Sequence, residues 1–291
     1  MNGYRGRFAP SPSGPLHFGS LVAALGSWIR GRAAGGGWNV GYGDEARAGS
    51  TRRWPPAILA TLAAFGLEAD EPVVLQSARE SLYEAALARL REAGHAYPCA
   101  CSRSDLEAFA GLHPQSCVRT AEAGQPVAWR LRVPDGRIAF DDRVCGPVEQ
   151  ALRGSVGDFV LRRANGEYTY QLAVVVDDAA QGISEVVRGA DLLDSTPRQI
   201  LLRNLLGLPD TGWLHLPLVL DAAGRKLAKR DAAHPLDPAD PLPALHRALA
   251  VLGQPLPAAA SLDAILAAAI AGFDIARIPR SIHLHAAMQD D

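Results

Sequence analysis

The sequence has no excess of charge of either sign, no long apolar run and few cysteines. Its 29 lysines and arginines against 31 aspartates and glutamates leave a net charge of −2. The chain as a whole therefore lacks the basic field that attracts nucleic acid, and any contact with RNA must come from a local patch. The Ala-rich stretch at residues 262–270 is too short to cross a membrane.

The N-terminal residues lack the charged-then-apolar pattern of a secretory signal peptide, because Arg5 and Arg7 are followed by prolines. We therefore expect a cytoplasmic protein. In that compartment the 4 cysteines, three of them clustered, favour metal ligation over disulfides. The 291 residues, 48% of them hydrophobic, suffice for two domains or for one large α/β domain with an insertion.

Residues 7–20 form the most informative stretch, Arg-Phe-Ala-Pro-Ser-Pro-Ser-Gly-Pro-Leu-His-Phe-Gly-Ser. They predict a short strand, a turn stiffened by prolines and a helix from about Leu16. Such a strand–turn–helix crossing presents free N–H groups to an anion, and His17 lies where its ring can reach a phosphate. The alternative is a proline-rich loop with a surface histidine, so the interpretation depends on a matching partner downstream.

Strand-like and helical patterns alternate along much of the chain, which predicts an α/β fold with a doubly wound parallel sheet. The expected helices lie at residues 17–32, 56–65, 77–92 and 196–206, the third capped by Ser77. The expected strands lie at residues 38–42, 73–75, 159–161, 186–191 and 216–220.

The alternation breaks at residues 96–154, which we interpret as an insertion into the sheet domain. Two strand-like runs in it, 128–132 and 137–141, are joined by Pro-Asp-Gly, and this predicts a hairpin. The expected division of the chain is a first half of a nucleotide-binding domain at 1–95, the insertion at 96–154, a second half at 155–234 and a helical C-terminal segment at 235–291.

The insertion also contains the cysteine cluster. Cys99, Cys101 and Cys117 together with His113 supply three soft sulfurs and one imidazole, a set that suits a closed tetrahedral zinc site of the structural type. The alternative is a group of reduced thiols without a metal. Cys145 lies outside the cluster and is expected to act as a small apolar filler.

A basic run, Arg-Lys-Leu-Ala-Lys-Arg, occupies residues 225–230. Lys226 and Lys229 on such a loop can close over a triphosphate and stabilise the charge that moves to a leaving pyrophosphate. By itself a basic run is more often a solvated surface. Combined with the N-terminal turn, it becomes far more specific for ATP.

These two motifs resemble the two nucleotide signatures of the class I aminoacyl-tRNA synthetases, with residues 16–19 as the first and 226–230 as the second. The form Arg-Phe-Ala-Pro-Ser-Pro-Ser-Gly-Pro-Leu-His is similar to the glutamyl branch. The Cys-x-Cys insertion and the short helical tail point further to the glutamyl-Q tRNA(Asp) synthetase family, a glutamyl-tRNA synthetase paralogue without an anticodon-binding domain. The resemblance runs from about Arg7 to Lys229.

The resemblance implies an ATP-dependent ligase that activates L-glutamate to glutamyl-adenylate and passes the glutamyl group to queuosine in the anticodon of tRNA(Asp). It implies ATP with Mg²⁺, L-glutamate and that tRNA as partners, one structural Zn²⁺ per chain, no membrane, and we expect a monomer. It assigns catalysis to His17 and Lys229, and ATP binding to His17, Gly19, Lys226 and Lys229.

For the glutamate pocket the resemblance implies the residues Arg7, Phe8, Ala9, Pro10, Ser11, Gly43, Tyr170 and Arg188. Two arginines suit a dicarboxylate substrate, because a guanidinium group binds a carboxylate through two parallel hydrogen bonds. The alternative for these arginines is an ordinary ion pair to Asp177 or Asp191.

One stretch departs from the family pattern. Gly43 stands where the family has a glutamate that anchors the substrate ammonium, and the length between Trp38 and Leu59 is kept while the residue identities are not. Compensating frame shifts in the coding DNA would explain this mismatch, and an intact frame on resequencing would refute that hypothesis. Otherwise Asp44 or Glu45 takes over the anchor, or glutamate affinity is weak.

Other functions stay open at this point. One is a truncated glutamyl-tRNA synthetase that charges a tRNA 3′ end. Another is a catalytically impaired homologue that acts as a binding protein, because with Gly43 it has lost the glutamate pocket. A different nucleotidyl-transferase with the same fold has less reason to carry both the two arginines and the cysteine cluster.

Overall fold

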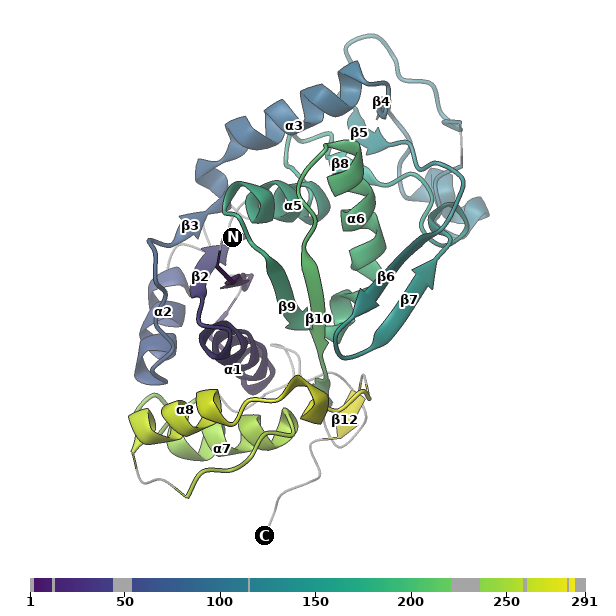
Figure 1. Ribbon diagram of the computed structural model, residues 1–291. Helices are drawn as coiled ribbons and strands as arrows, with labels where there is room; N and C mark the ends of the chain where they lie inside the picture. Colours follow the sequence, from purple (N-terminus) through teal and green to yellow (C-terminus); the bar gives the residue numbers. More distant parts are fainter. Residues whose placement is uncertain are drawn as a thin grey trace.

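The computed structural model describes residues 3–11, 14–43, 54–114, 116–220, 236–258, 261–281 and 283–285 (Figure 1). Its first sheet is parallel, with the strand order β1-β2-β3 and the bounds Arg5–Phe8, Gly37–Tyr42 and Val74–Leu75. Its second sheet has the strand order β7-β6-β10-β9 and the bounds Gly146–Gln150, Ile138–Asp142, Gly212–Leu216 and Glu185–Gly189. There β9–β10 and β10–β6 are parallel pairs and β6–β7 is antiparallel.

The two sheets meet where β1 lies against β9. The N–H of Ser184 donates to the carbonyl of Arg5 at 2.9 Å, and the N–H of Arg5 donates to Ser184 Oγ at 2.8 Å. The combined strand order is therefore β3-β2-β1-β9-β10-β6-β7. From β1 the chain adds β2 and β3 toward one edge, whereas from β9 it adds β10 toward the other, so the topological switch point lies between β1 and β9. Ligands of doubly wound folds bind in the crevice at such a switch point, beyond the carboxyl ends of the strands.

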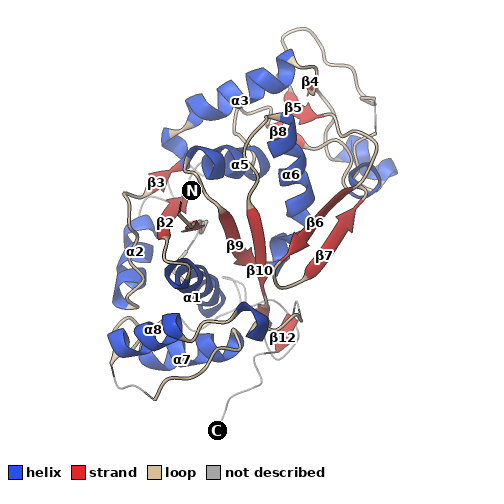
Figure 2. Ribbon diagram, viewed as in Figure 1, coloured by secondary structure: helices blue, strands red, loops and turns tan. Residues whose placement is uncertain are grey.

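Helices surround these strands (Figure 2). Their bounds are Phe18–Ala33 for α1, Trp54–Ala64 for α2, Glu80–Glu92 for α3, Leu152–Ser155 for α4, Tyr170–Ala180 for α5, Thr196–Leu205 for α6, Leu242–Val251 for α7 and Leu262–Ala271 for α8. Single-turn or two-turn 3-10 helices occur at Gln76–Ala78, Ser104–Phe109, Ala190–Ser195 and Ile275–Arg277. None of the helices in the described ranges combines the length and the apolar character that a membrane span requires.

Helix α1 connects the site to the core. It begins after His17 and ends before Gly35, whose φ of +66° is a left-handed conformation that glycine adopts without strain. Leu25 and Ile29 in its middle are fully buried. The helix contacts β1 and β2 on one side and α7 and α8 on the other, so its first turn is held firmly beside the carboxyl end of β1.

The α/β class with a parallel sheet is confirmed, and the expected helices and strands near α1, α2, α6, β2, β3 and β9 are found within two residues at nearly every end. The expected cap of α3 is wrong. Ser77 lies inside a 3-10 turn, and α3 begins at Glu80 after Arg79 without a side-chain cap.

The expected hairpin between residues 128–132 and 137–141 is also wrong. Strand β5 (Ala128–Leu131) pairs with β4 (Ala96–Cys99) and β8 (Val160–Arg162) in a separate antiparallel sheet, whereas β6 pairs with β7 and β10. The turn lies one strand later, because Asp142 Oδ1 accepts the N–H groups of Val144 and Cys145 at 3.0 and 2.8 Å and Gly146 has φ +78°.

The expected strand at 216–220 is two strands. β10 ends at Leu216, and β11 (Leu218–Leu220) pairs in parallel with β12 (His283–His285) instead of continuing the main sheet. Pro217 lies between β10 and β11 and has no N–H to donate to a ladder. The division of the chain at residues 95, 154 and 234 stays a prediction.

Candidate active site

A cavity of about 390 Å³ opens at the switch point of the sheet, beyond the carboxyl ends of β1, β9 and β10. It brings together most of the predicted site residues, namely Arg7, Phe8, Ala9, Pro10, Ser11, His17, Gly19, Tyr170 and Arg188. Gly43 does not border it. Lys226 and Lys229, like Asp44 and Glu45, lie outside the described residues.

His17 is the residue that precedes α1, and its ring folds back onto the first turn of that helix. Its Nδ1 accepts the N–H of Ser20 at 3.3 Å, and its Nε2 lies 3.0 Å from Ser20 Oγ. The histidine thus satisfies one of the free N–H groups that the turn offers. The same ring borders the cavity, so it lies at the N-terminus of α1, where an anion would bind.

Arg7 is buried and already paired. Its Nε and Nη2 donate to the two carboxylate oxygens of Asp178 at 2.9 and 3.0 Å. Burial lowers the pKa of Arg7, but the adjacent Asp178 more than offsets this, so the pKa lies above its ordinary value. An ordinary ion pair was the alternative for this arginine, and the partner is Asp178 rather than Asp177 or Asp191.

Arg188 is equally buried but differs in its partners, which are neutral throughout the described residues. They are His215 Nε2 at 3.1 Å, Gln199 Oε1 at 2.8 Å, Tyr170 OH at 3.3 Å, Thr196 Oγ1 at 2.8 Å and the Leu192 carbonyl at 3.2 Å. Burial lowers the pKa of this guanidinium and the charge of Arg7 adds to the effect, while Tyr170 and Asp178 oppose it without outweighing it. A buried cation beside a cavity favours an anionic ligand there.

A carboxylate–imidazole pair, not predicted from the sequence, lies behind Arg188. Asp142 Oδ2 is 2.6 Å from His215 Nδ1, and both side chains are fully buried. Burial raises the pKa of Asp142, but hydrogen bonds from His215 and from backbone N–H groups outweigh it, so this pKa lies below its ordinary value. Burial lowers the pKa of His215, which keeps the imidazole neutral. The one sequence signal was a polar residue within the apolar run Trp-Leu-His-Leu.

Gly43 borders a second cavity, of about 30 Å³, that shares Arg7 with the larger one. A Cβ on Gly43 would lie 3.0 Å from Gln76 Oε1, so a neutral amide occupies the space beside it. Gln76 Nε2 donates to Asp177 at 2.9 Å, and Asp177 also accepts from Arg79 at 2.6 Å. The role of Gly43 in glutamate binding stays a prediction.

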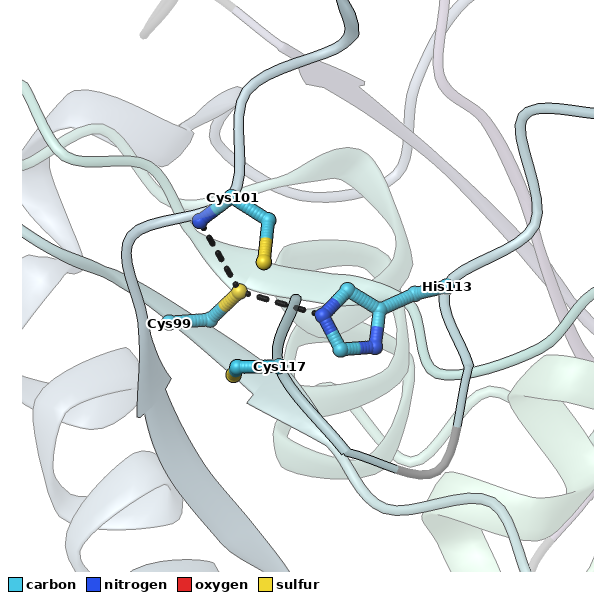
Figure 3. Close-up of side chains that lie close together, drawn as sticks. All are labelled: Cys99, Cys101, His113 and Cys117. Carbon is cyan, nitrogen blue, oxygen red and sulfur yellow. Dashed lines mark hydrogen bonds between the residues drawn. The ribbon is translucent and has the colours of Figure 1, made fainter. Parts of the chain in front are cut away.

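The four predicted metal ligands come together beside β4 (Figure 3). The ligand atoms of Cys99, Cys101, His113 and Cys117 all lie within 4.8 Å of one another. His113 Nδ1 donates to the Pro114 carbonyl at 2.6 Å, which leaves Nε2 unprotonated and 3.2 Å from Cys99 Sγ. Three thiols and one imidazole nitrogen at this spacing fit a tetrahedral zinc, which is held at about 2.0–2.3 Å from such ligands.

Neighbouring side chains form hydrogen bonds that hold the ligands of this cluster in place. Arg130 Nε donates to Cys99 Sγ at 3.3 Å, and Tyr97 OH lies 3.1 Å from His113 Nδ1 while it donates to Asp158 at 2.7 Å. Burial, with the neighbouring Cys99, raises the pKa of Cys117 to about 12. Crowded thiols lose their protons far more readily when a metal ion binds them.

The fold and this site define a class I synthetase catalytic domain, and the chain belongs to that family. Residues 4–113 and 107–239 match the family described as tRNA synthetases class I (E and Q), catalytic domain. Two relatives, both named glutamyl-Q tRNA(Asp) synthetase, are similar over nearly their whole length. The one from Xanthomonas campestris pv. campestris (strain 8004) is 54% identical, covering 99% of this chain and 97% of its own. The one from Burkholderia mallei (strain ATCC 23344) is 55% identical, covering 94% and 97%.

A solved structure shares the fold. The glutamate tRNA ligase from Elizabethkingia meningosepticum, in complex with its amino acid, superposes with a TM-score of 0.81 at 24% identity. The match covers 96% of this chain and 66% of that one, so this chain spans just under two thirds of that ligase. The predicted resemblance to class I synthetases is confirmed.

The Arg7–Asp178 pair generates a stability prediction. Asp178→Asn removes one charge of a buried pair and leaves Arg7 uncompensated, so we expect it to lower the free energy of unfolding by about 3 kcal/mol. The matched control is Glu167→Gln, which breaks the more exposed Arg163–Glu167 pair on the surface and should change stability by less than about 1 kcal/mol. Urea denaturation of both variants measures the difference, and equal losses would contradict a structural role for Asp178.

Proposed function

We propose that this chain is an ATP-dependent ligase that activates L-glutamate and transfers it to queuosine in the anticodon of tRNA(Asp). The observation that carries the proposal is Arg188, a buried cation with neutral partners at the edge of the cavity. A substrate carboxylate would supply the missing counter-charge. Relatives of 54–55% identity that bear the name glutamyl-Q tRNA(Asp) synthetase support glutamate as that substrate.

Arg7 and Arg188 have different roles in the proposed pocket. Arg7 is neutralised by Asp178, so it holds the floor of the pocket and offers only its remaining N–H groups. Arg188 keeps its charge, and its contact to Tyr170 OH is its longest, at 3.3 Å. The side-chain carboxylate of glutamate would bind at this Arg188–Tyr170 edge. There it would replace the contact from Arg188 to Tyr170 OH and gain a charge-assisted hydrogen bond in a region of low dielectric constant.

Activation then needs positioning rather than a protein nucleophile. The α-carboxylate oxygen of glutamate attacks the α-phosphorus of ATP in line, and the bond from that phosphorus to the pyrophosphate oxygen breaks. His17 at the start of α1 would stabilise the phosphates, and Lys226 and Lys229 would contribute positive charge from the basic run. Class I synthetases use ATP with Mg²⁺, which neutralises phosphate oxygens when it is bound.

In the second step a hydroxyl of queuosine attacks the activated carbonyl carbon of the glutamyl group. AMP leaves with the electrons of the acyl–phosphate bond, and the hydroxyl proton is released. The alternative acceptor is the 3′-terminal ribose of a tRNA, as in a truncated glutamyl-tRNA synthetase.

The cysteine cluster would hold one structural zinc ion. Cys99, Cys101, His113 and Cys117 fill all four positions of a tetrahedron, so no open position is left for a substrate. The ion would fasten the end of β4 to the loop that carries His113 and Cys117. Three reduced thiols that ligate a metal also support the proposal of a cytoplasmic protein. A monomeric state stays a prediction.

The first step predicts ATP–pyrophosphate exchange that depends on glutamate, does not occur with aspartate and needs no tRNA. Arg188→Ala should lower kcat/KM for glutamate by about 100-fold or more, because the carboxylate loses its charged partner. Arg163→Ala is the control, since Arg163 is exposed and pairs only with Glu167 in the described residues. Failure of the wild-type chain to catalyse exchange at high glutamate would favour the binding-protein alternative.

The second step predicts that radiolabelled glutamate is attached to tRNA(Asp) only when the wobble position of the anticodon carries queuosine. The control is the same tRNA with guanosine at that position, which has an identical 3′ end. Equal labelling of the two tRNAs would show charging of the 3′ end and would contradict transfer to queuosine.

The metal site predicts one zinc per chain in the purified protein by inductively coupled plasma mass spectrometry. Cys99→Ser should lower the zinc content to a small fraction of the wild-type value, because a hydroxyl is a poor ligand for this ion. Cys145→Ser is the matched control and should keep the full content, since Cys145 lies outside the cluster. If the wild-type chain is expressed in zinc-supplemented medium and the purified protein contains no zinc, the proposed site is contradicted.

A further inference from the structure

Arg188 is held from behind by a buried pair that does not touch the cavity. Asp142 ends β6, and His215 lies in the neighbouring strand β10, next to β9 that carries Arg188 (Figure 1). Neither Asp142 nor His215 lines the cavity. A contact between them and a ligand is therefore not required, and any effect they have on binding must pass through Arg188.

The hydrogen bonds allow only one tautomer of His215. Arginine has donors and no acceptor, so the bond from Arg188 Nε at 3.1 Å requires an unprotonated Nε2 on His215. The hydroxyl of Thr196 lies 3.2 Å from the same nitrogen, but it has another acceptor in the Leu192 carbonyl at 3.4 Å, so the bond from Arg188 sets the tautomer. The ring proton is therefore on Nδ1, where it is donated to Asp142 Oδ2 at 2.6 Å.

Asp142 imposes this tautomer because its own orientation is fixed by the backbone. Its Oδ1 accepts the N–H groups of Val144 and Cys145 at 3.0 and 2.8 Å. The other oxygen, Oδ2, is left for His215, and an ionised carboxylate can only accept. An asparagine at this position would keep its oxygen on the backbone N–H groups and turn its NH₂ toward Nδ1. The proton would then move to Nε2 and oppose the N–H of Arg188.

The neutral charge of the His215 imidazole matters as much as the position of its acceptor nitrogen. A carboxylate bonded directly to Arg188 would neutralise it, as Asp178 neutralises Arg7. The imidazole instead orients Arg188 Nε while the charge of Asp142 stays one ring away. Gln199 assists in the same manner, since its amide accepts from Arg188 at 2.8 Å and is itself fixed by donating to Gln171 at 3.0 Å.

We propose that Asp142 and His215 are positioning residues for substrate recognition. Asp142 selects the His215 tautomer that accepts from Arg188, and this aims the guanidinium at a carboxylate in the cavity without cancelling its charge. The inference rests on the proposed binding of glutamate, and it adds two residues that act on the specificity of that site.

Steady-state exchange kinetics test the consequence for substrate binding. Asp142→Asn should raise KM for glutamate by roughly 10-fold, the effect of one lost or reversed hydrogen bond, and leave KM for ATP within about twofold. Asp141→Asn is the matched control, because Asp141 is the exposed neighbour in the same strand. Equal KM values for glutamate in the two variants, or a matching rise in KM for ATP, would overturn the proposal.

Two substitutions of His215 separate orientation from simple packing. In His215→Gln the amide oxygen reaches the position of Nε2 and still accepts from Arg188, whereas in His215→Asn the shorter amide reaches only Asp142. We expect the glutamine variant to keep a KM for glutamate clearly below that of the asparagine variant. The opposite order would overturn the proposal, since it would make the bond to Asp142, and not the acceptor for Arg188, the feature that matters.

A measurement without catalysis tests the tautomer itself. Long-range ¹H–¹⁵N NMR of the imidazole nitrogens, with the His215 signal assigned by its loss in the two variants, should show Nδ1–H in the wild type and Nε2–H in Asp142→Asn. An Nε2–H tautomer in the wild type would overturn the inference whatever the activity. A wild-type chain with the Nδ1–H tautomer but no exchange with glutamate would refute the proposed function alone.

Discussion

Arg188 lies in the protein interior with five hydrogen-bond donors and one positive charge, and the surrounding structure has to satisfy both. The donors are satisfied by a ring, two side-chain oxygens, an amide and a carbonyl, all of them neutral. The charge is left for a ligand. Arg7, on the neighbouring strand β1, is the opposite case, since both carboxylate oxygens of Asp178 accept from it. Burial is similar for the two arginines, so the difference lies in their partners.

This arrangement depends on the order of strands in the sheet. Parallel strands bring their carboxyl ends to one edge, and the reversal between β1 and β9 opens the crevice there. Arg7, Arg188 and His215 come from β1, β9 and β10, and Asp142 comes from β6, which joins the same sheet at the far side of β10. The segment around residues 96–154 therefore contributes to two regions: β4 and β5 build the sheet next to the cysteine cluster, and β6 and β7 extend the main sheet.

Local patterns in the sequence predicted the elements well where burial and turn residues agreed. The apolar spacing of α1, its end at Gly35 and the proline-stiffened turn before it all act over a few residues. The wrong predictions of a hairpin and of a single strand also came from short local patterns. Pro134-Asp135-Gly136 has the composition of a hairpin turn, but the chain turns back at Asp142–Gly146, where a carboxylate accepts two N–H groups. Pro217 divides what looked like one strand, because it cannot donate to a ladder.

The sequence by itself determined the chemistry available to this protein: the turn that precedes α1, the two arginines, and the three cysteines and one histidine of the metal cluster. The turn and the metal ligands are recognisable from residue type and short spacing, and the two arginines from the family resemblance. Only the tertiary structure decided which arginine is neutralised and which keeps its charge, and that Asp142 and His215 stand behind Arg188. Those facts depend on contacts between residues up to 171 positions apart, as in the bond from Arg7 to Asp178. Strand order sets such contacts, and no local pattern encodes them.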